Sequence, residues 1–106
     1  MPWILQQYED NRGTRPVEEV LESLEESDRG VVKAKLFYLQ ERGTQMREPL
    51  SKSLGGGLFE LRVQAYRLFF CFRAGNRIVL LHAFRKKSQA TPRRELELAR
   101  KRMQEV

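Results

Sequence analysis

The sequence predicts an α+β fold, in which an antiparallel sheet is covered by helices, and three observations support this class. The hydrophobic spacing is helical over residues 16–42 and changes to strict alternation from residue 58 onward. Two apolar strands, 66–73 and 77–84, are separated only by the hairpin turn Ala74-Gly75-Asn76. A helical pattern returns after Thr91-Pro92. Consecutive strands flanked by helices are typical of α+β proteins rather than of alternating α/β proteins.

Length and composition limit the class of protein further. The chain has 106 residues, 41% of them hydrophobic, so we expect a single domain spanning residues 1–106 with enough apolar material for a core. No apolar run approaches the roughly 18 residues of a membrane span, which excludes an integral membrane protein. Residues 1–7 do not resemble a secretory signal. Cys71 is the only cysteine, which excludes a disulfide framework and a cysteine-rich zinc site, so we expect a cytosolic protein.

The charge is unevenly distributed along the chain. The formal net charge is +6. Residues 1–50 hold 7 Lys and Arg against 10 Asp and Glu, whereas residues 51–106 hold 13 against 4. A basic C-terminal half favours a polyanionic partner, such as RNA, DNA or a ribosome surface, or an acidic protein. The alternative is an ordinary protein with surplus surface cations.

The N-terminal half predicts one strand and two helices. Residues 3–8 are partly apolar and indicate a strand, and residues 9–14 indicate a loop. Pro16 suits the first position of a helix, whose apolar side is formed by Val17, Val20, Leu21 and Leu24. Ser27-Asp28 can cap a second helix that ends near Arg42, with Gly43 as its stop. Because the connection is short, we expect the two helices to form an antiparallel hairpin.

The next segment predicts a loop and then a half-buried strand. Residues 44–57 contain Pro49 and Gly55-Gly56-Gly57, and we expect them to be irregular, with the glycines in a tight exposed turn. A phosphate-binding loop is disfavoured, because no Gly-Lys-Ser/Thr follows. From residue 58 the chain alternates: Phe59, Leu61 and Val63 share one face, and Leu58, Glu60 and Arg62 share the other.

The hairpin around Gly75 predicts which residues meet at the sheet end. If Arg73 pairs with Arg77, the following pairs are Phe72–Ile78, Phe70–Leu80, Leu68–His82, Arg67–Ala83 and Tyr66–Phe84. The basic residues expected to converge there are Arg62, Arg67, Arg85, Lys86 and Lys87, with Lys52 on the preceding loop. Like charges in one concavity repel one another unless an anionic partner neutralises them. We therefore favour a binding site for a polyanion over independently solvated side chains.

These residues also form motifs that resemble a known toxin family. In chain order they are Leu58-Phe59-Glu60-Leu61-Arg62, Tyr66-Arg67, the apolar strand 78–84, Arg85-Lys86-Lys87 and Thr91-Pro92-Arg93-Arg94-Glu95. The combination resembles the HigB-type toxins of the RelE/ParE superfamily, which are phage-associated toxins of type II toxin–antitoxin systems. The resemblance implies a RelE-like fold, with a twisted antiparallel sheet covered by an N-terminal helical hairpin and a C-terminal helix.

The resemblance also implies an activity and partners. Such a toxin enters the A site of the small ribosomal subunit and cleaves mRNA, without a metal or other cofactor. The ribose 2′-hydroxyl attacks the adjacent phosphate, while basic side chains stabilise charge and move protons. A small helix-turn-helix antitoxin would bind the toxin and repress the shared operon.

The residue chemistry suggests roles within that mechanism. Guanidinium groups match phosphate oxygens and stabilise a phosphorane, which favours Arg62 and Arg67 as catalytic residues. Neighbouring positive charges favour the neutral form of a lysine, which makes Lys87 or Lys86 a candidate for proton transfer, with Lys52 next. Lys52 and Arg85 are candidate RNA-binding residues. Tyr66 and Phe84 could stack on a base, although a place in the core at the sheet end is the more ordinary role.

Other residues leave the general base open. His82 is the only histidine, and we interpret it as a core residue bonded to the backbone rather than as the base. The last helix lacks the tyrosine or histidine that some nucleases of the superfamily use there. Glu60 is interpreted as a solvated residue or a salt-bridge partner of an arginine, and the acidic first helix as a solvated face rather than an antitoxin surface. Two further functions remain open: a ParE-like inhibitor of DNA gyrase, and a noncatalytic basic RNA- or DNA-binding module.

Overall fold

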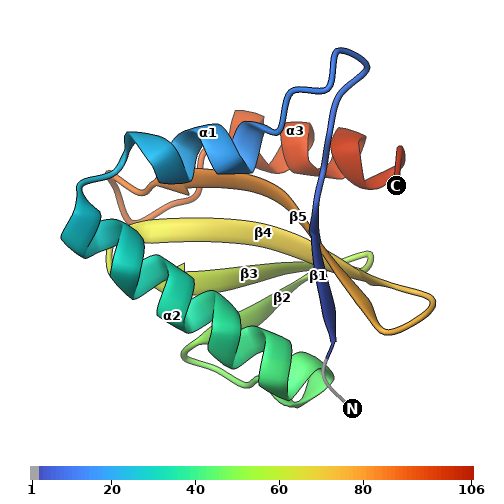
Figure 1. Cartoon of the computed structure of the whole chain (residues 1–106), viewed down its shortest axis with the longest axis horizontal. Helices are drawn as coiled ribbons and strands as arrows, with labels where there is room; N and C mark the ends of the chain where they lie inside the picture. The colour runs from blue at the N-terminus through green and yellow to red at the C-terminus, as the bar shows by residue number, and fades with distance from the viewer. Residues whose placement is uncertain (1–2) are drawn as a thin grey trace.

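The computed structural model describes residues 3–106 and contains a five-stranded mixed sheet (Figure 1). The strands are β1 (Ile4–Gln7), β2 (Ser51–Gly55), β3 (Leu58–Val63), β4 (Tyr66–Arg73) and β5 (Arg77–Arg85), in the spatial order β1-β5-β4-β3-β2. The helices are α1 (Pro16–Ser23), α2 (Glu26–Arg42) and α3 (Arg93–Met103), with a short 3₁₀ turn, η1, over Gly43–Gln45. Met1 and Pro2, part of the segment inspected for a secretory signal, lie outside the described residues.

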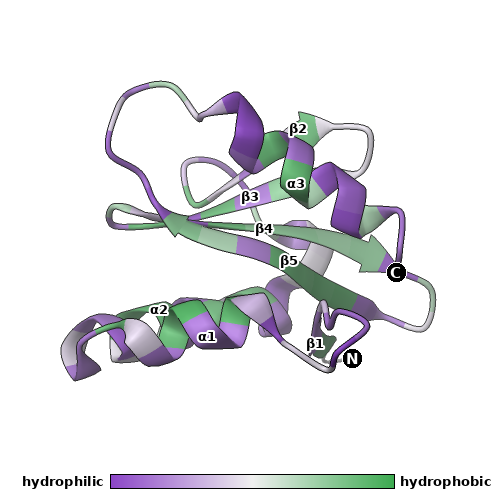
Figure 2. Cartoon of the chain, turned by 90° about the horizontal axis from the view of Figure 1, so that it is seen from above, coloured by the Kyte–Doolittle hydropathy of each residue, from purple (hydrophilic) through white to green (hydrophobic). Residues whose placement is uncertain are grey.

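Helices cover both faces of the sheet, so the molecule has three layers and two apolar cores. Figure 2 shows α1 and α2 on one side of the sheet and α3 on the other. The larger core joins Val17, Leu21, Val32, Leu36 and Leu39 of the two N-terminal helices to β3, β4 and β5. The smaller core packs Ala99 of α3 against Leu58, Phe69, Cys71, Val79 and Leu81. None of the described helices is both long enough and apolar enough to cross a membrane.

The sheet is mixed because β1 runs parallel to β5, from Ile4 opposite Arg77 to Gln7 opposite Leu80. This corrects the expectation of a wholly antiparallel sheet. No hairpin joins β1 to its neighbour, since the chain passes through two helices and re-enters the sheet at the far edge. Local turn chemistry therefore carried no information about the direction of β1.

Part of the expected loop 44–57 is a strand. Residues 51–55 form β2, which pairs antiparallel with β3 through Ser51–Leu61, Lys52–Glu60 and Ser53–Phe59. An edge strand needs little apolar alternation, so its polar sequence gave no sign of a strand. The three glycines form the β2–β3 turn with φ values of +88°, +62° and +88°, which confirms the tight exposed turn. These left-handed values explain why glycine occupies the turn.

The β4–β5 register follows the prediction for half of its length. Arg73–Arg77, Phe72–Ile78 and Phe70–Leu80 pair as expected. A bulge that leaves Leu81 unpaired then shifts the register by one residue. The pairs beyond it are Phe69–His82, Leu68–Ala83, Arg67–Phe84 and Tyr66–Arg85, so the expected pairs Leu68–His82, Arg67–Ala83 and Tyr66–Phe84 are wrong.

The two N-terminal helices follow each other closely but diverge over the sheet (Figure 1). Only Leu24 and Glu25 separate them, and α1 packs on β5 whereas α2 packs on β3, so the antiparallel hairpin is an approximation. The expected cap at Ser27-Asp28 is wrong, because α2 already begins at Glu26. Asp28 instead accepts a hydrogen bond of 3.0 Å from the Tyr66 hydroxyl.

Gly43 ends α2, as predicted, and also makes room for Trp3. Its φ is +55°, and a Cβ at this position would fall on the Trp3 indole. Trp3 itself is fixed by its backbone N–H, which donates to Gln40 O at 3.1 Å. A side chain at residue 43 would therefore separate β1 from the end of α2.

We predict that Gly43→Ala lowers the free energy of unfolding by about 3 kcal/mol, since it combines a left-handed backbone with overpacking. Gly75→Ala is the matched control, because its φ is +82° but no atom lies within 4 Å of the added Cβ. It should cost only about 1–2 kcal/mol. Urea unfolding of both variants measures the difference, and equal losses would contradict the role of the Trp3 contact.

Candidate functional site

A buried carboxylate joins two arginines at the end of the sheet. Arg62 of β3 lies directly opposite Arg67 of β4, so both side chains are on the α3 face. Glu60 lies two residues before Arg62 on the same face, and its side chain is only 2% exposed. Its Oε2 lies 3.2 Å from Arg62 Nε, and its Oε1 lies 3.6 Å from Arg67 Nε. The salt-bridge interpretation of Glu60 is therefore confirmed, and the solvated one is wrong.

Backbone carbonyls of the β3–β4 turn also hold the Arg67 side chain. Its Nη1 donates hydrogen bonds of 2.8 Å to the carbonyl oxygens of Gln64 and Tyr66. The side chain is 15% exposed. The 3.6 Å separation from Glu60 is longer than a hydrogen bond, and Glu60 Oε1 and Arg67 Nε have no other partner within residues 3–106. The turn carbonyls and the nearby carboxylate therefore position the guanidinium group.

A shallow depression of about 420 Å³ lies beside Arg67, and we call it the basic concavity. Its lining residues are Ala65, Arg67, Lys86, Lys87, Ser88 and Gln89. The Lys86 backbone N–H donates to Ala65 O at 2.7 Å, which ties the segment after β5 to the β3–β4 turn. The structure thus brings Arg67, Lys86 and Lys87 together, with Arg62 connected to them through Glu60.

Arg85 and Tyr66 do not join this group. Because of the bulge they lie opposite each other, and the Arg85 guanidinium carbon lies 5.8 Å from the centre of the Tyr66 ring. Both line a separate depression with Val20, Leu24 and Asp28 on the α1–α2 side of the sheet. The hydrogen bond to Asp28 raises the pKa of the Tyr66 hydroxyl, with burial as a second cause. The expected convergence is therefore wrong for Arg85, whereas Tyr66 is a buried residue of the larger core, which agrees with the core role expected for it.

Lys52 and Phe84 lie on the α3 face. Lys52 is exposed and opposite Glu60, but it lines a different depression, with Met46 and Phe59, and not the basic concavity that it was expected to join. Phe84 is opposite Arg67 and half-buried. Its ring packs edge-on against Phe69, with centres 5.3 Å apart, and stacks on His82 at 5.5 Å. This packing is that of a residue at the edge of the smaller core.

His82 is held by α3 rather than by the backbone, which corrects the earlier interpretation. Its Nε2 lies 3.0 Å from Glu95 Oε2, and its Nδ1 lies 3.3 Å from Arg102 Nη1. With the proton on Nε2, the ring donates to Glu95 and accepts from Arg102. Arg102 also donates to Leu81 O at 2.9 Å. His82 therefore joins both ends of α3 to β5 and does not line the basic concavity.

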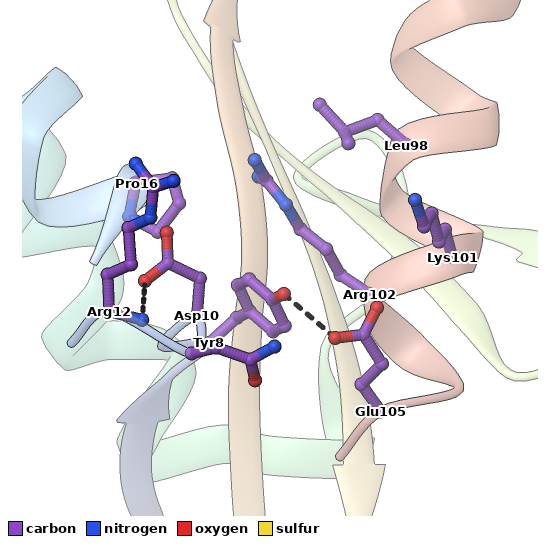
Figure 3. Close-up of a pocket in the computed structure, with 9 residues that line it drawn as sticks. Tyr8, Asp10, Arg12, Pro16, Leu98, Lys101, Arg102 and Glu105 are labelled. Atoms are coloured by element: carbon purple, nitrogen blue, oxygen red, sulfur yellow. Dashed lines mark hydrogen bonds between the residues drawn. The ribbon is translucent and has the colours of Figure 1, made fainter. Parts of the chain in front are cut away.

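A larger depression, of about 570 Å³, lies between α3 and the loop after β1 (Figure 3). The Tyr8 hydroxyl donates to Glu105 at 2.9 Å, and the Arg102 guanidinium carbon lies 5.2 Å from the Tyr8 ring centre. This hydrogen bond raises the pKa of Tyr8. The depression mixes acidic and basic side chains, whereas the ionic groups lining the basic concavity are all cationic. Nowhere in residues 3–106 do His, Cys, Asp or Glu side chains cluster as metal ligands would.

Sequence reasoning missed the burial of Glu60 and the partners of His82. The alternation over 58–63 placed Glu60 on the face of Arg62, but it did not show that the carboxylate is buried. The residue types gave no sign that Glu95 and Arg102, which are far from His82 in sequence, would hold its ring.

Comparison with known proteins identifies the fold and then the family. The structure is similar to one in the crystal structure of the toxin–antitoxin complex RelBE2 from Mycobacterium tuberculosis, with a TM-score of 0.63 and 19% sequence identity. The match covers 81% of this chain and 100% of that one, so the fold is the α+β fold of RelE-type toxins. The chain belongs to the phage-derived Gp49-like protein family (DUF891), whose model matches residues 19–104. No curated protein sequence matches it.

We predict that Glu60→Ala lowers the free energy of unfolding by about 2–3 kcal/mol, because it leaves two partly buried arginines without their anion. The loss is below that for a fully buried pair, since both arginines retain contact with solvent. Glu9→Ala is the control: its pair with Arg15 has exposed side chains, at 58% for Arg15 and 51% for Glu9, and should contribute less than about 1 kcal/mol. Urea unfolding distinguishes the two pairs, and a neutral Glu60→Ala would contradict the structural role.

Proposed function

We propose that the chain is the toxin of a type II toxin–antitoxin system and acts as a ribosome-dependent endoribonuclease. The observation that carries this proposal is the basic concavity, where Arg67, Lys86 and Lys87 converge beside the Arg62–Glu60 pair. A concave group of cations fits a phosphodiester and not an apolar substrate. The RelE-type fold and the Gp49-like family support the same class.

The proposed chemistry needs the RNA itself and the basic side chains. The ribose 2′-oxygen forms a bond to the adjacent phosphorus, and the bond from phosphorus to the 5′-oxygen breaks. The products are a 2′,3′-cyclic phosphate and a 5′-hydroxyl end. The proton leaving the 2′-hydroxyl must be accepted, and one must reach the 5′-oxygen, so the reaction is balanced without an oxidant or a metal.

Each charged residue then has a distinct task. Arg67 faces the concavity and stabilises the extra negative charge of the phosphorane, since a fixed guanidinium is strongest where water is partly excluded. Arg62 assists from the neighbouring strand, and Lys52 contacts a flanking phosphate. We assign proton transfer to the lysine pair Lys86 and Lys87, which line the concavity. Arg85 and Tyr66 have no part in this proposal, because they lie on the opposite face.

The proposed partners follow from the class of toxin. The substrate is mRNA positioned in the A site of the small ribosomal subunit, and the inhibitor is a helix-turn-helix antitoxin. The structural neighbour is itself part of a toxin–antitoxin complex, which supports an antitoxin partner. We place the reaction in the cytoplasm, where ribosomes and mRNA meet.

We predict that induced expression arrests growth and produces new mRNA 5′ ends inside translated codons. Arg67→Ala should reduce cleavage by about 100-fold or more, as expected when a charge-stabilising donor is lost. Lys33→Ala, on an exposed position of α2, should leave cleavage unchanged. Mapping of mRNA 5′ ends measures this directly. Blocked replication with intact mRNA would instead indicate a gyrase inhibitor, and salt-sensitive RNA binding without toxicity would indicate a noncatalytic module.

We also predict that Lys86→Arg combined with Lys87→Arg preserves RNA binding but slows cleavage by about 100-fold, because arginine keeps its charge and does not exchange a proton near neutral pH. Single-turnover cleavage in a reconstituted translation reaction measures the rate, and filter binding measures affinity for RNA. Lys101→Arg, on α3 outside the basic concavity, is the matched control. Full activity of the double variant would remove the lysine pair from proton transfer.

A further inference from the structure

The exposed side of α2 carries three large apolar side chains. Its inner side carries the buried residues Val32, Leu36 and Leu39. Its outer side nevertheless presents Val31, Phe37 and Tyr38, which are 39%, 58% and 38% exposed. A surface helix normally presents polar side chains to solvent, so an apolar outer side indicates a surface that a partner covers.

This outer side is hollowed, and we call the hollow the α2 groove. It has a volume of about 520 Å³ and is lined by Val31, Ala34, Lys35, Tyr38 and Leu50. Ala34 is the smallest of these residues and is exposed, and Phe37 follows it three positions later on the helix, outside the lining of the groove. Leu50, from the segment before β2, closes the second wall.

Cations border the groove. The Lys35 ammonium lies 6.0 Å from the centre of the Tyr38 ring, and the Arg42 guanidinium carbon lies 4.8 Å from it. Lys35 is the ionic residue among those lining the groove. The groove therefore combines an apolar floor with a basic rim, which complements an amphipathic segment with acidic flanks.

The groove and the basic concavity lie on different faces. The groove belongs to α2, and Figure 2 shows α2 and α3 on opposite sides of the sheet. Arg62, Arg67 and Glu60 alternate with the side chains of the larger core, so they point to the α3 side. An apolar floor does not suit the phosphates of RNA. A second copy of this chain, seated face to face, would bring Lys35 and Arg42 of both copies together, and like charges at an interface oppose association.

We propose that the α2 groove is a docking site for the antitoxin, which seats the apolar ridge of an acidic amphipathic helix there. The mode is a helix in a groove, with apolar anchors between Val31 and Tyr38 and carboxylates directed at Lys35 and Arg42. This inference rests on the proposed toxin function and adds the surface by which the toxin is recognised. The antitoxin can hold this groove without filling the basic concavity.

The test measures binding of the purified chain to the helix-turn-helix protein encoded in the same operon. We expect Val31→Ser with Tyr38→Ser to raise the dissociation constant at least tenfold, as expected when central apolar anchors are lost. Lys35→Glu should weaken binding at low salt and less so at high salt. Ile4→Ser is the matched control, because Ile4 is 52% exposed but lies on β1.

Folding and activity serve as internal checks. Since Val31 and Tyr38 are exposed and lie outside the basic concavity, the double variant should stay folded and keep its mRNA cleavage, yet escape neutralisation by the antitoxin in cells. Wild-type affinity in the groove variants would overturn the proposal while leaving the toxin function intact. A change in self-association with unchanged antitoxin binding would also overturn it, in favour of a second copy. A wild-type chain that neither cleaves mRNA nor stops growth would refute the toxin function itself.

Discussion

The end of the sheet depends on one carboxylate buried among arginines. Glu60, only 2% exposed, lies against Arg62 and Arg67, which are directly opposite each other on adjacent strands. Two guanidinium groups at that separation repel each other, and the buried anion offsets this repulsion while fixing both side chains on one face. With its orientation set by Glu60 and by the turn carbonyls, Arg67 faces the basic concavity as a preorganised group rather than as a mobile surface cation.

The bulge in β5 decides which face of the sheet Arg85 occupies. By shifting the register one residue, it places Arg85 opposite Tyr66 on the side of α1 and α2. Lys86 and Lys87, which follow Arg85, line the basic concavity together with Arg67. Bulges are common where a strand must redirect a side chain next to a functional site. The same irregularity thus separates Arg85, which lies beside Tyr66 on the α1–α2 side, from the cations that line the basic concavity.

Much of the fold could be predicted from the sequence, because periodicity and turn chemistry are local. These local signals predicted where α1 and α3 begin and that α2 ends at Gly43. They also predicted the glycine turn after β2 and the hairpin turn at Gly75. What failed was non-local or polar: β1 has no hairpin to set its direction, β2 is a polar edge strand, and the bulge cannot be read from a regular alternation. The convergence of Arg67, Lys86 and Lys87 was predictable because position along a sheet survives a register slip of one residue. The pairing of Arg85 with Tyr66 was not predictable, because a register slip of one residue moves the Arg85 side chain to the other face of the sheet.

The hydrogen bond from Lys86 N–H to Ala65 O has an evolutionary consequence. It is made by the main chain at both ends, so replacing either side chain with another non-proline residue leaves the link in place. Substitutions at Ala65 and Lys86 can therefore change the side chains that line the basic concavity while the backbone around it keeps its conformation. Relatives that recognise different targets could diverge at these two positions without rebuilding the scaffold beneath them.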